Sequence, residues 1–169
     1  MPETAENAMP LSDSASPSIS AEEPVFFSGD VIRIAGVSLH QLRWLDERQI
    51  VSPRKEDHRC RYAPQQVLEI LAVCSLRRKG LSLARIRRIL RHLRREWAQH
   101  SAATPPSPSK LYLLTNGDSI HLEAQPEDIL DRLAGAKSPM YLVCLSDLSR
   151  TITSERPSRK SRTRQLPLF

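Results

Sequence analysis

The stretch from residue 30 to residue 53, DVIRIAGVSLHQLRWLDERQIVSP, constrains the fold of this chain more than any other. Apolar residues recur at helical spacing before Gly36, which has the backbone freedom to leave a helix sharply. Ser38 follows as an expected N-cap, because its hydroxyl can accept a free backbone N–H of the next turn. The sequence therefore predicts two short helices joined by a tight turn.

The second of these helices has an apolar face and a polar face. Leu39, Leu42 and Leu45 recur at three-residue spacing and are expected to point inward. The opposite face carries His40, Gln41, Arg43 and Trp44. A short helix with such donors behind a Gly-containing turn is typical of a helix-turn-helix whose second helix enters the DNA major groove. An ordinary helical hairpin has the same pattern, so the next segment decides between them.

The segment RKEDHRCRYA after Pro53 has hardly an apolar residue and is not expected in a core. A helix is then expected from about Pro64 to Lys79, where Gly80 ends it, and another helix opens at Ser82. In this order the parts resemble the MerR family of winged helix-turn-helix transcriptional regulators. The matching motifs are IAGVSLHQLRWLD, the VSP exit, the basic segment ending in RY, and RRKGLSLARIRRIL, within about residues 26–95.

The resemblance implies a homodimer that binds double-stranded DNA at a two-fold operator and distorts it to control a promoter. It also implies RNA polymerase as a further partner. The residues expected at the DNA interface are Ser38, His40, Gln41, Arg43, Trp44, Arg54, Lys55, Arg59, Arg61 and Tyr62. Among these, the wing residues would clamp phosphates and the helix residues would meet groove edges or backbone. Gln49 stands where a helix-ending glycine is usual in that family.

The charge distribution favours a polyanionic partner. Residues 30–100 hold 16 Lys and Arg against 7 Asp and Glu, a balance of +9, whereas residues 1–29 carry five acids and no base. Neutralising phosphates supplies the sequence-independent part of DNA affinity. A merely solvated basic surface is not favoured here, because the arginines coincide with the expected wing and helix-turn-helix.

The helix that opens at Ser82 has a regular apolar stripe, and two roles remain open for it. Its members are Leu83, Ile86, Leu90, Leu93 and Trp97. The core is favoured for Leu83 and Ile86, whereas a dimer seam is the alternative for Leu90, Leu93 and Trp97. Residues 101–109, SAATPPSPS, contain three prolines, so the helix is expected to end before them. The long dimerisation helix usual in MerR-like regulators is therefore not expected.

A second unit is expected over residues 110–149. LYLLT and SIHLE flank Asn116-Gly117, a strong hairpin signal, a helix is expected from Pro126 to Ala136, and MYLVCLSDL reads as a buried strand. The result is a β-β-α-β module of some forty residues, too small to be stable alone. It is expected to pair with its own copy or with the DNA-binding domain.

The expected organisation is a mainly α winged helix-turn-helix domain followed by a small α+β module, with disordered tails. The ranges are a tail at 1–24, the DNA-binding domain at 25–100, a linker at 101–109, the module at 110–149 and a basic tail at 150–169. The tail ends in a peptide whose anchors would be Gln165, Leu166, Leu168 and Phe169. This QLPLF peptide resembles those that dock on the bacterial replication sliding clamp, although it could instead cover a strand edge of the module.

No pattern indicates an active site, a metal site or a cofactor site. The acids and the single histidine of residues 110–149 are scattered, and the three cysteines of the chain show no CxxC spacing. His58 and Cys60 offer only two ligands on a polar loop. We therefore expect no enzyme activity, no metal and no cofactor.

The expected location is the cytoplasm, in association with the nucleoid of a bacterium. No apolar run approaches the roughly 20 residues of a membrane-spanning helix, and no secretory signal is recognisable, so no membrane partner is expected. The predicted function is sequence-specific transcriptional regulation of the MerR type. The alternative is a DNA-associated adaptor or nucleoid protein that docks on the sliding clamp.

Overall fold

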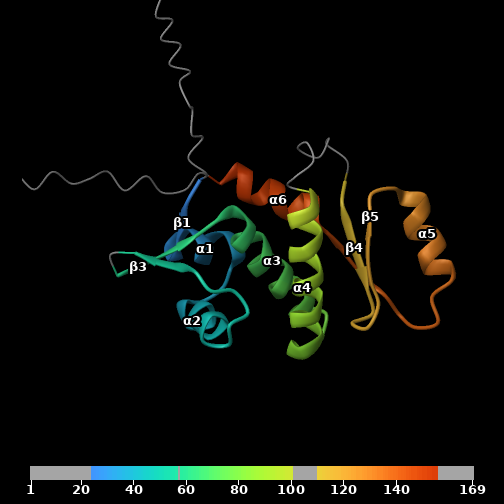
Figure 1. The fold of residues 1–169 in the computed structure, drawn as a ribbon, viewed down its shortest axis with the longest axis horizontal. Helices are drawn as coiled ribbons and strands as arrows, with labels where there is room; N and C mark the ends of the chain where they lie inside the picture. The colour runs from blue at the N-terminus through green and yellow to red at the C-terminus, as the bar shows by residue number, and fades with distance from the viewer. Residues whose placement is uncertain (1–23, 57, 101–109, 156–169) are drawn as a thin grey trace, which may run out of the picture.

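The computed structural model describes residues 24–56, 58–100 and 110–155. The predictions for residues 1–23, for the linker and for the QLPLF peptide lie outside these ranges. Two regions of secondary structure are present, one with two helical pairs and a small sheet and one built on a second sheet (Figure 1).

The first region begins with a short strand that the sequence did not predict. Its elements are β1 (Phe26–Phe27), α1 (Ser28–Ala35), α2 (Leu39–Glu47), β2 (Arg54–Glu56), β3 (Arg59–Tyr62), α3 (Pro64–Arg78) and α4 (Leu83–His100). The antiparallel sheet has the order β1-β3-β2, with Phe26 opposite Tyr62 and Arg54 opposite Arg61. Strand β3 is therefore the middle strand of this sheet, with β1 along one edge and β2 along the other. Strands β2 and β3 form the hairpin that was expected to be the wing.

The turn between α1 and α2 confirms the two local predictions. Gly36 ends α1 with φ of 62°, in the left-handed region, and its N–H donates to the Ile32 carbonyl at 3.0 Å. The Ser38 hydroxyl accepts from the Gln41 N–H at 3.1 Å, while the Gln41 side chain accepts from the Ser38 N–H at 2.8 Å. This reciprocal capping box fixes where α2 begins and the direction in which it leaves the turn.

The second region contains β4 (Tyr112–Thr115), β5 (Ile120–Glu123), α5 (Pro126–Ala134), β6 (Tyr141–Cys144) and α6 (Leu145–Ser154). The sheet is antiparallel with the order β5-β4-β6. Asn116 closes the β4–β5 turn, because its side-chain oxygen accepts from the Asp118 and Ser119 N–H groups at 2.9 and 2.7 Å. The expected β-β-α-β order is therefore present.

Helix α6 corrects two predictions. The strand expected through MYLVCLSDL ends at Cys144, and residues 150–154 of the expected tail are helical. Leu145, Leu148 and Ile152 recur at helical spacing, and Leu145 and Ile152 are buried. Helix α6 packs along α3, so this apolar stripe is buried by a helix distant in sequence. An ion pair between Arg33 and Glu155 further joins α1 to the residue that follows α6.

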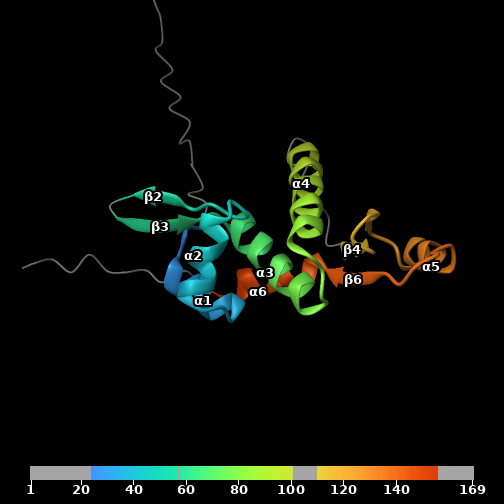
Figure 2. The ribbon, with the colours of Figure 1, turned by 90° about the horizontal axis from the view of Figure 1, so that it is seen from below.

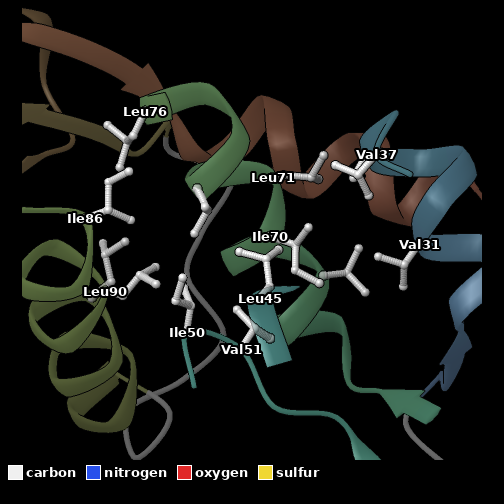
Figure 3. Close-up of a cluster of buried hydrophobic side chains, with 14 of the residues drawn as sticks. Val31, Val37, Leu45, Ile50, Val51, Ile70, Leu71, Leu76, Ile86 and Leu90 are labelled. Carbon is white, nitrogen blue, oxygen red and sulfur yellow. The ribbon is translucent and has the colours of Figure 1, made fainter. Parts of the chain in front are cut away.

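One hydrophobic core joins the two regions, and α3 lies at its centre. Figure 3 shows side chains from α1, α2 and α4, represented by Val31, Leu45 and Leu90, meeting the side chains of α3. The same cluster includes Leu113 of β4 and Val143 of β6. The module therefore packs on the helix-turn-helix part of its own chain, which was one of the two pairings expected for it.

Candidate nucleic-acid interface

Helix α2 presents its polar residues outward. His40, Gln41 and Arg43 are exposed, while Leu42 and Leu45 are 3% and 4% exposed and hold the helix to the core. Trp44 is half-buried, and the Arg48 guanidinium lies 5.8 Å from the centre of its ring. The exposed face thus offers amide, imidazole and guanidinium groups to solvent, and amide and guanidinium groups are among those that read base edges in the major groove.

The prediction that Leu39 points inward is wrong. Leu39 is 45% exposed, because α2 rests on the core through Leu42 and Leu45 and its first residue overhangs that contact. Its side chain lines a surface hollow of about 340 Å³ between α2, the start of α1 and the β3 strand. Arg43, Arg59 and Asp46 line the same hollow, so its walls carry two guanidinium groups and one carboxylate.

The β2–β3 hairpin lies beside α2, and Figure 2 shows both from below. Lys55 Nζ lies 3.0 Å from Asp46 Oδ2 of α2, and this hydrogen bond raises the pKa of Lys55. Arg61 Nη1 lies 2.6 Å from Glu56 Oε2 within the hairpin. The Arg54 side chain is 80% exposed, and Arg59 is exposed as well. Arg54 Nη1 also lies 3.9 Å from Glu56 Oε1, and the Lys55 side chain is 69% exposed. The four basic residues predicted for the wing are thus all at least partly open to solvent, and Arg54, Lys55 and Arg61 each lie near a carboxylate.

Tyr62, which the sequence places at the DNA interface, has a largely buried side chain at the edge of the hollow. Tyr62 is 3% exposed and belongs to the core cluster, because the antiparallel register with β1 sets it opposite the buried Phe26. Burial raises the pKa of Tyr62 to about 12. Its role is therefore to anchor β3, and through β3 the hairpin, to the core.

Two arginines of α4 hold the chain that leaves α2, and the sequence analysis did not identify them. Arg94 donates through Nε and Nη2 to the two carboxylate oxygens of Glu69 at 2.9 and 2.6 Å, and through Nη2 to the Ile50 carbonyl at 2.7 Å. Arg87 donates to the Arg48 carbonyl at 2.8 Å. Glu69 is 3% exposed, and the Glu69 hydrogen bonds raise the pKa of Arg94. An acid in the apolar helix α3 was the available sequence signal, since a buried carboxylate requires a partner.

The apolar stripe of α4 serves the core of its own chain at its centre. Leu90 and Leu93 are 1% and 0% exposed, so the structure favours the core over a dimer seam for both residues. The physical reason is that α4 packs against α3 along this stripe. Trp97 is partly buried and also packs against the cluster.

Arg85 and Arg88 of α4 bind the β4–β5 turn. The Asp118 carboxylate lies 3.1 Å from Arg85 Nη2 and 2.5 Å from Arg88 Nη2, and Arg88 also donates to the Gly117 carbonyl at 2.6 Å. These contacts tie the module to the start of α4. They also neutralise part of the basic surface that the sequence places on this helix.

Other kinds of site have little support within the described ranges. No group of three or more His, Cys, Asp or Glu residues there is arranged to hold a metal ion. Burial raises the pKa of Cys74, which disfavours its reactive thiolate form. No helix in these ranges has the length and apolar content that crossing a bilayer requires.

Comparison with known families identifies the first region. Residues 27–93 match the family described as MerR HTH family regulatory protein. The match runs from the end of β1 into α4 and includes α1, α2, the β2–β3 hairpin and α3. Residues 110–155 lie outside it. A search of curated proteins returned no match.

Proposed function

Because residues 27–93 form a helix-turn-helix domain of the MerR family of DNA-binding transcription regulators, we propose that this protein recognises a specific operator as a homodimer. In this proposal α2 enters the major groove and the β2–β3 hairpin contacts the flanking backbone. The operator is two-fold related, so that each protomer binds one half-site. The bound dimer distorts the DNA between the half-sites, and this distortion controls transcription by RNA polymerase at the promoter.

The observation that carries this proposal is that the capped helix α2 lies beside a hairpin with exposed basic side chains. Arg43 projects from α2 beside the hollow, and Arg54 and Arg59 are exposed on the hairpin. A guanidinium can donate to both acceptors of a guanine in the major groove. Basic side chains of the β2–β3 hairpin that contact phosphates add affinity without sequence preference. We therefore assign site selection to α2 and general affinity to the hairpin.

Selection of binding sites from a random duplex library tests the proposal. The full-length protein should enrich one two-fold-related sequence. Arg43→Ala should weaken binding to that sequence by roughly 1–3 kcal/mol and relax its preference at one position. Arg54→Ala, a matched loss of one exposed arginine, should weaken binding to all duplexes alike and reduce the salt dependence.

Two results would contradict the assignment. If the selection enriched no sequence, the protein would bind DNA only nonspecifically and the proposal of a sequence-specific regulator would be refuted. If Arg54→Ala altered the preferred sequence while Arg43→Ala lowered affinity uniformly, the roles of α2 and the hairpin would be reversed.

A second candidate function rests on the sequence of residues 165–169 alone. QLPLF resembles sliding-clamp docking peptides, with Leu166, Leu168 and Phe169 as anchors and Gln165 as a hydrogen-bond partner. We propose it as a docking peptide that adds a replication partner to the DNA-binding domain. A peptide of residues 160–169 titrated against a purified clamp tests this, and binding that survives Leu168→Ala with Phe169→Ala would refute it.

A further inference from the structure

Leu39 differs from the other apolar side chains of the MerR domain because it is exposed. Of the large hydrophobic side chains described within residues 27–93, Leu39 is the one that is exposed, at 45%, while the others are buried or partly buried. A single exposed leucine is ordinary on a protein surface, so its position decides whether it has a role. Leu39 is the first residue of α2, directly after the Ser38 cap. In helix-turn-helix proteins, the N-terminal residues of the second helix are those that contact base edges.

Leu39 and Arg43 lie together at one surface hollow. They are four positions apart in α2, so they are neighbours on one face of the helix. Both line the hollow of about 340 Å³ described above, and Phe27 and Leu42 add further apolar lining. The hollow therefore combines an apolar surface with a guanidinium group.

The ion pairs around the hollow favour an anionic ligand. Asp46 also lines the hollow, but its carboxylate lies 3.0 Å from Lys55 Nζ. Within the described ranges, no ion pair of the helix-turn-helix or the hairpin involves Arg43 or Arg59, the two guanidinium groups at the hollow. Two guanidinium groups without a carboxylate partner suit a polyanion better than the apolar surface of a second protein. Of the occupants that an exposed leucine could have, DNA fits this charge.

The Gln41 side chain, on the same exposed face, is engaged by the helix cap. Its oxygen accepts the Ser38 N–H at 2.8 Å, which directs the carboxamide back towards the start of α2. A two-bond contact with adenine needs both the oxygen and the nitrogen of a carboxamide. We therefore expect base recognition by α2 to depend more on its other exposed side chains.

We propose that Leu39 contacts a thymine methyl group in the major groove while Arg43 contacts a nearby guanine. Thymine is the base that presents an apolar group there, its C5-methyl, and guanine presents two acceptors that suit a guanidinium. Four residues of helix rise roughly 6 Å, which is about two base-pair steps of roughly 3.4 Å. Each operator half-site thus contains a thymine and a guanine within about two base pairs of each other. The inference rests on the operator-binding regulator proposed above and names the base groups that α2 recognises.

Deoxyuridine substitution in the selected operator tests the methyl contact without changing the protein. Deoxyuridine pairs with adenine as thymine does and lacks only the methyl group. Each thymine of one half-site is replaced in turn, together with its two-fold mate, and the dissociation constant of the full-length protein is measured. At one position the replacement should raise the dissociation constant about fourfold for each half-site, because a buried methyl group is lost.

Leu39→Ala tests whether Leu39 makes this contact. The variant should bind the thymine operator more weakly than the wild type does, and it should bind the thymine and deoxyuridine operators equally. Leu130→Ala is the matched control, because Leu130 is also an exposed leucine, at 66%. Leu130 belongs to α5, which Figures 1 and 2 both place at the opposite end of the molecule from α2. This control should keep the full methyl effect.

A second base analogue tests the contact assigned to Arg43. Replacing one guanine by 7-deazaguanine removes the N7 acceptor and should weaken binding of the wild type. Arg43→Ala should lose this response and keep the response to deoxyuridine. The two variants should therefore each lose sensitivity to one base group and retain sensitivity to the other.

Four results would overturn the proposal. They are an operator in which no thymine methyl affects affinity, a methyl effect that persists in Leu39→Ala, a Leu39→Ala variant that weakens all duplexes alike, and one that changes self-association in sedimentation but not DNA affinity. The third would place Leu39 against the DNA backbone, and the fourth would place it against a second copy. An operator that is enriched but insensitive to deoxyuridine would refute the methyl contact and leave the regulator standing, whereas enrichment of no sequence would refute both.

Discussion

Replacing Arg94 by Met should destabilise the protein, because it leaves the buried Glu69 carboxylate without its hydrogen-bond donor. The Glu69 side chain is 4% exposed, and Arg94 donates two hydrogen bonds to its carboxylate. Arg94 also donates a hydrogen bond to the Ile50 carbonyl. Breaking a fully buried pair costs about 3–5 kcal/mol. The Arg94 side chain is 42% exposed, so water screens the pair, and we expect about 2–3 kcal/mol.

Equilibrium urea unfolding at pH 7 measures this loss. Arg91→Met is the matched control, because Arg91 is an exposed arginine on the same helix, and it should change the free energy of unfolding by less than about 0.5 kcal/mol. The double variant Glu69→Leu with Arg94→Met removes both charges and should recover most of the loss.

Two results would refute this reasoning. If Arg94→Met cost no more than Arg91→Met, the pair would contribute nothing to stability. If the double variant were as unstable as Arg94→Met alone, the cost would come from lost packing or from the free Ile50 carbonyl and not from the stranded carboxylate.

Two further predictions concern single residues. The pKa of Tyr62 is raised by burial from 10.0 to about 12, so the unfolded chain ionises first and stability falls as the pH rises from 10 towards 12. Tyr62→Phe should remove that part of the decline in a series of alkaline unfolding curves, and an unchanged slope would contradict the assignment. Gln49 has φ of 53°, a left-handed conformation that favours glycine. Gln49→Gly should therefore raise the free energy of unfolding by about 0.5–1 kcal/mol in urea, whereas Gln49→Ala should not.

The sequence by itself determined the helix-turn-helix. Gly36 and Ser38 act through atoms within a few residues, so their roles depend little on the rest of the fold. The same is true of the Asn116 turn and of the helix that begins at Pro64. The family match over residues 27–93 agrees with the resemblance that these local features carry.

Only the tertiary structure decided which apolar and charged groups are buried. Leu39 and Leu93 have similar places in periodic patterns, yet one is exposed and the other is in the core. Tyr62 is buried because a strand more than thirty residues earlier pairs with β3, and Arg94 pairs with Glu69 across 25 positions. The apolar stripe of α6 with Leu145 and Ile152 packs on α3 in the same way, while the rest of that helix is largely exposed. Periodicity indicates that a helix or strand has an apolar face. Whether a residue on that face is buried depends on which distant element packs against it.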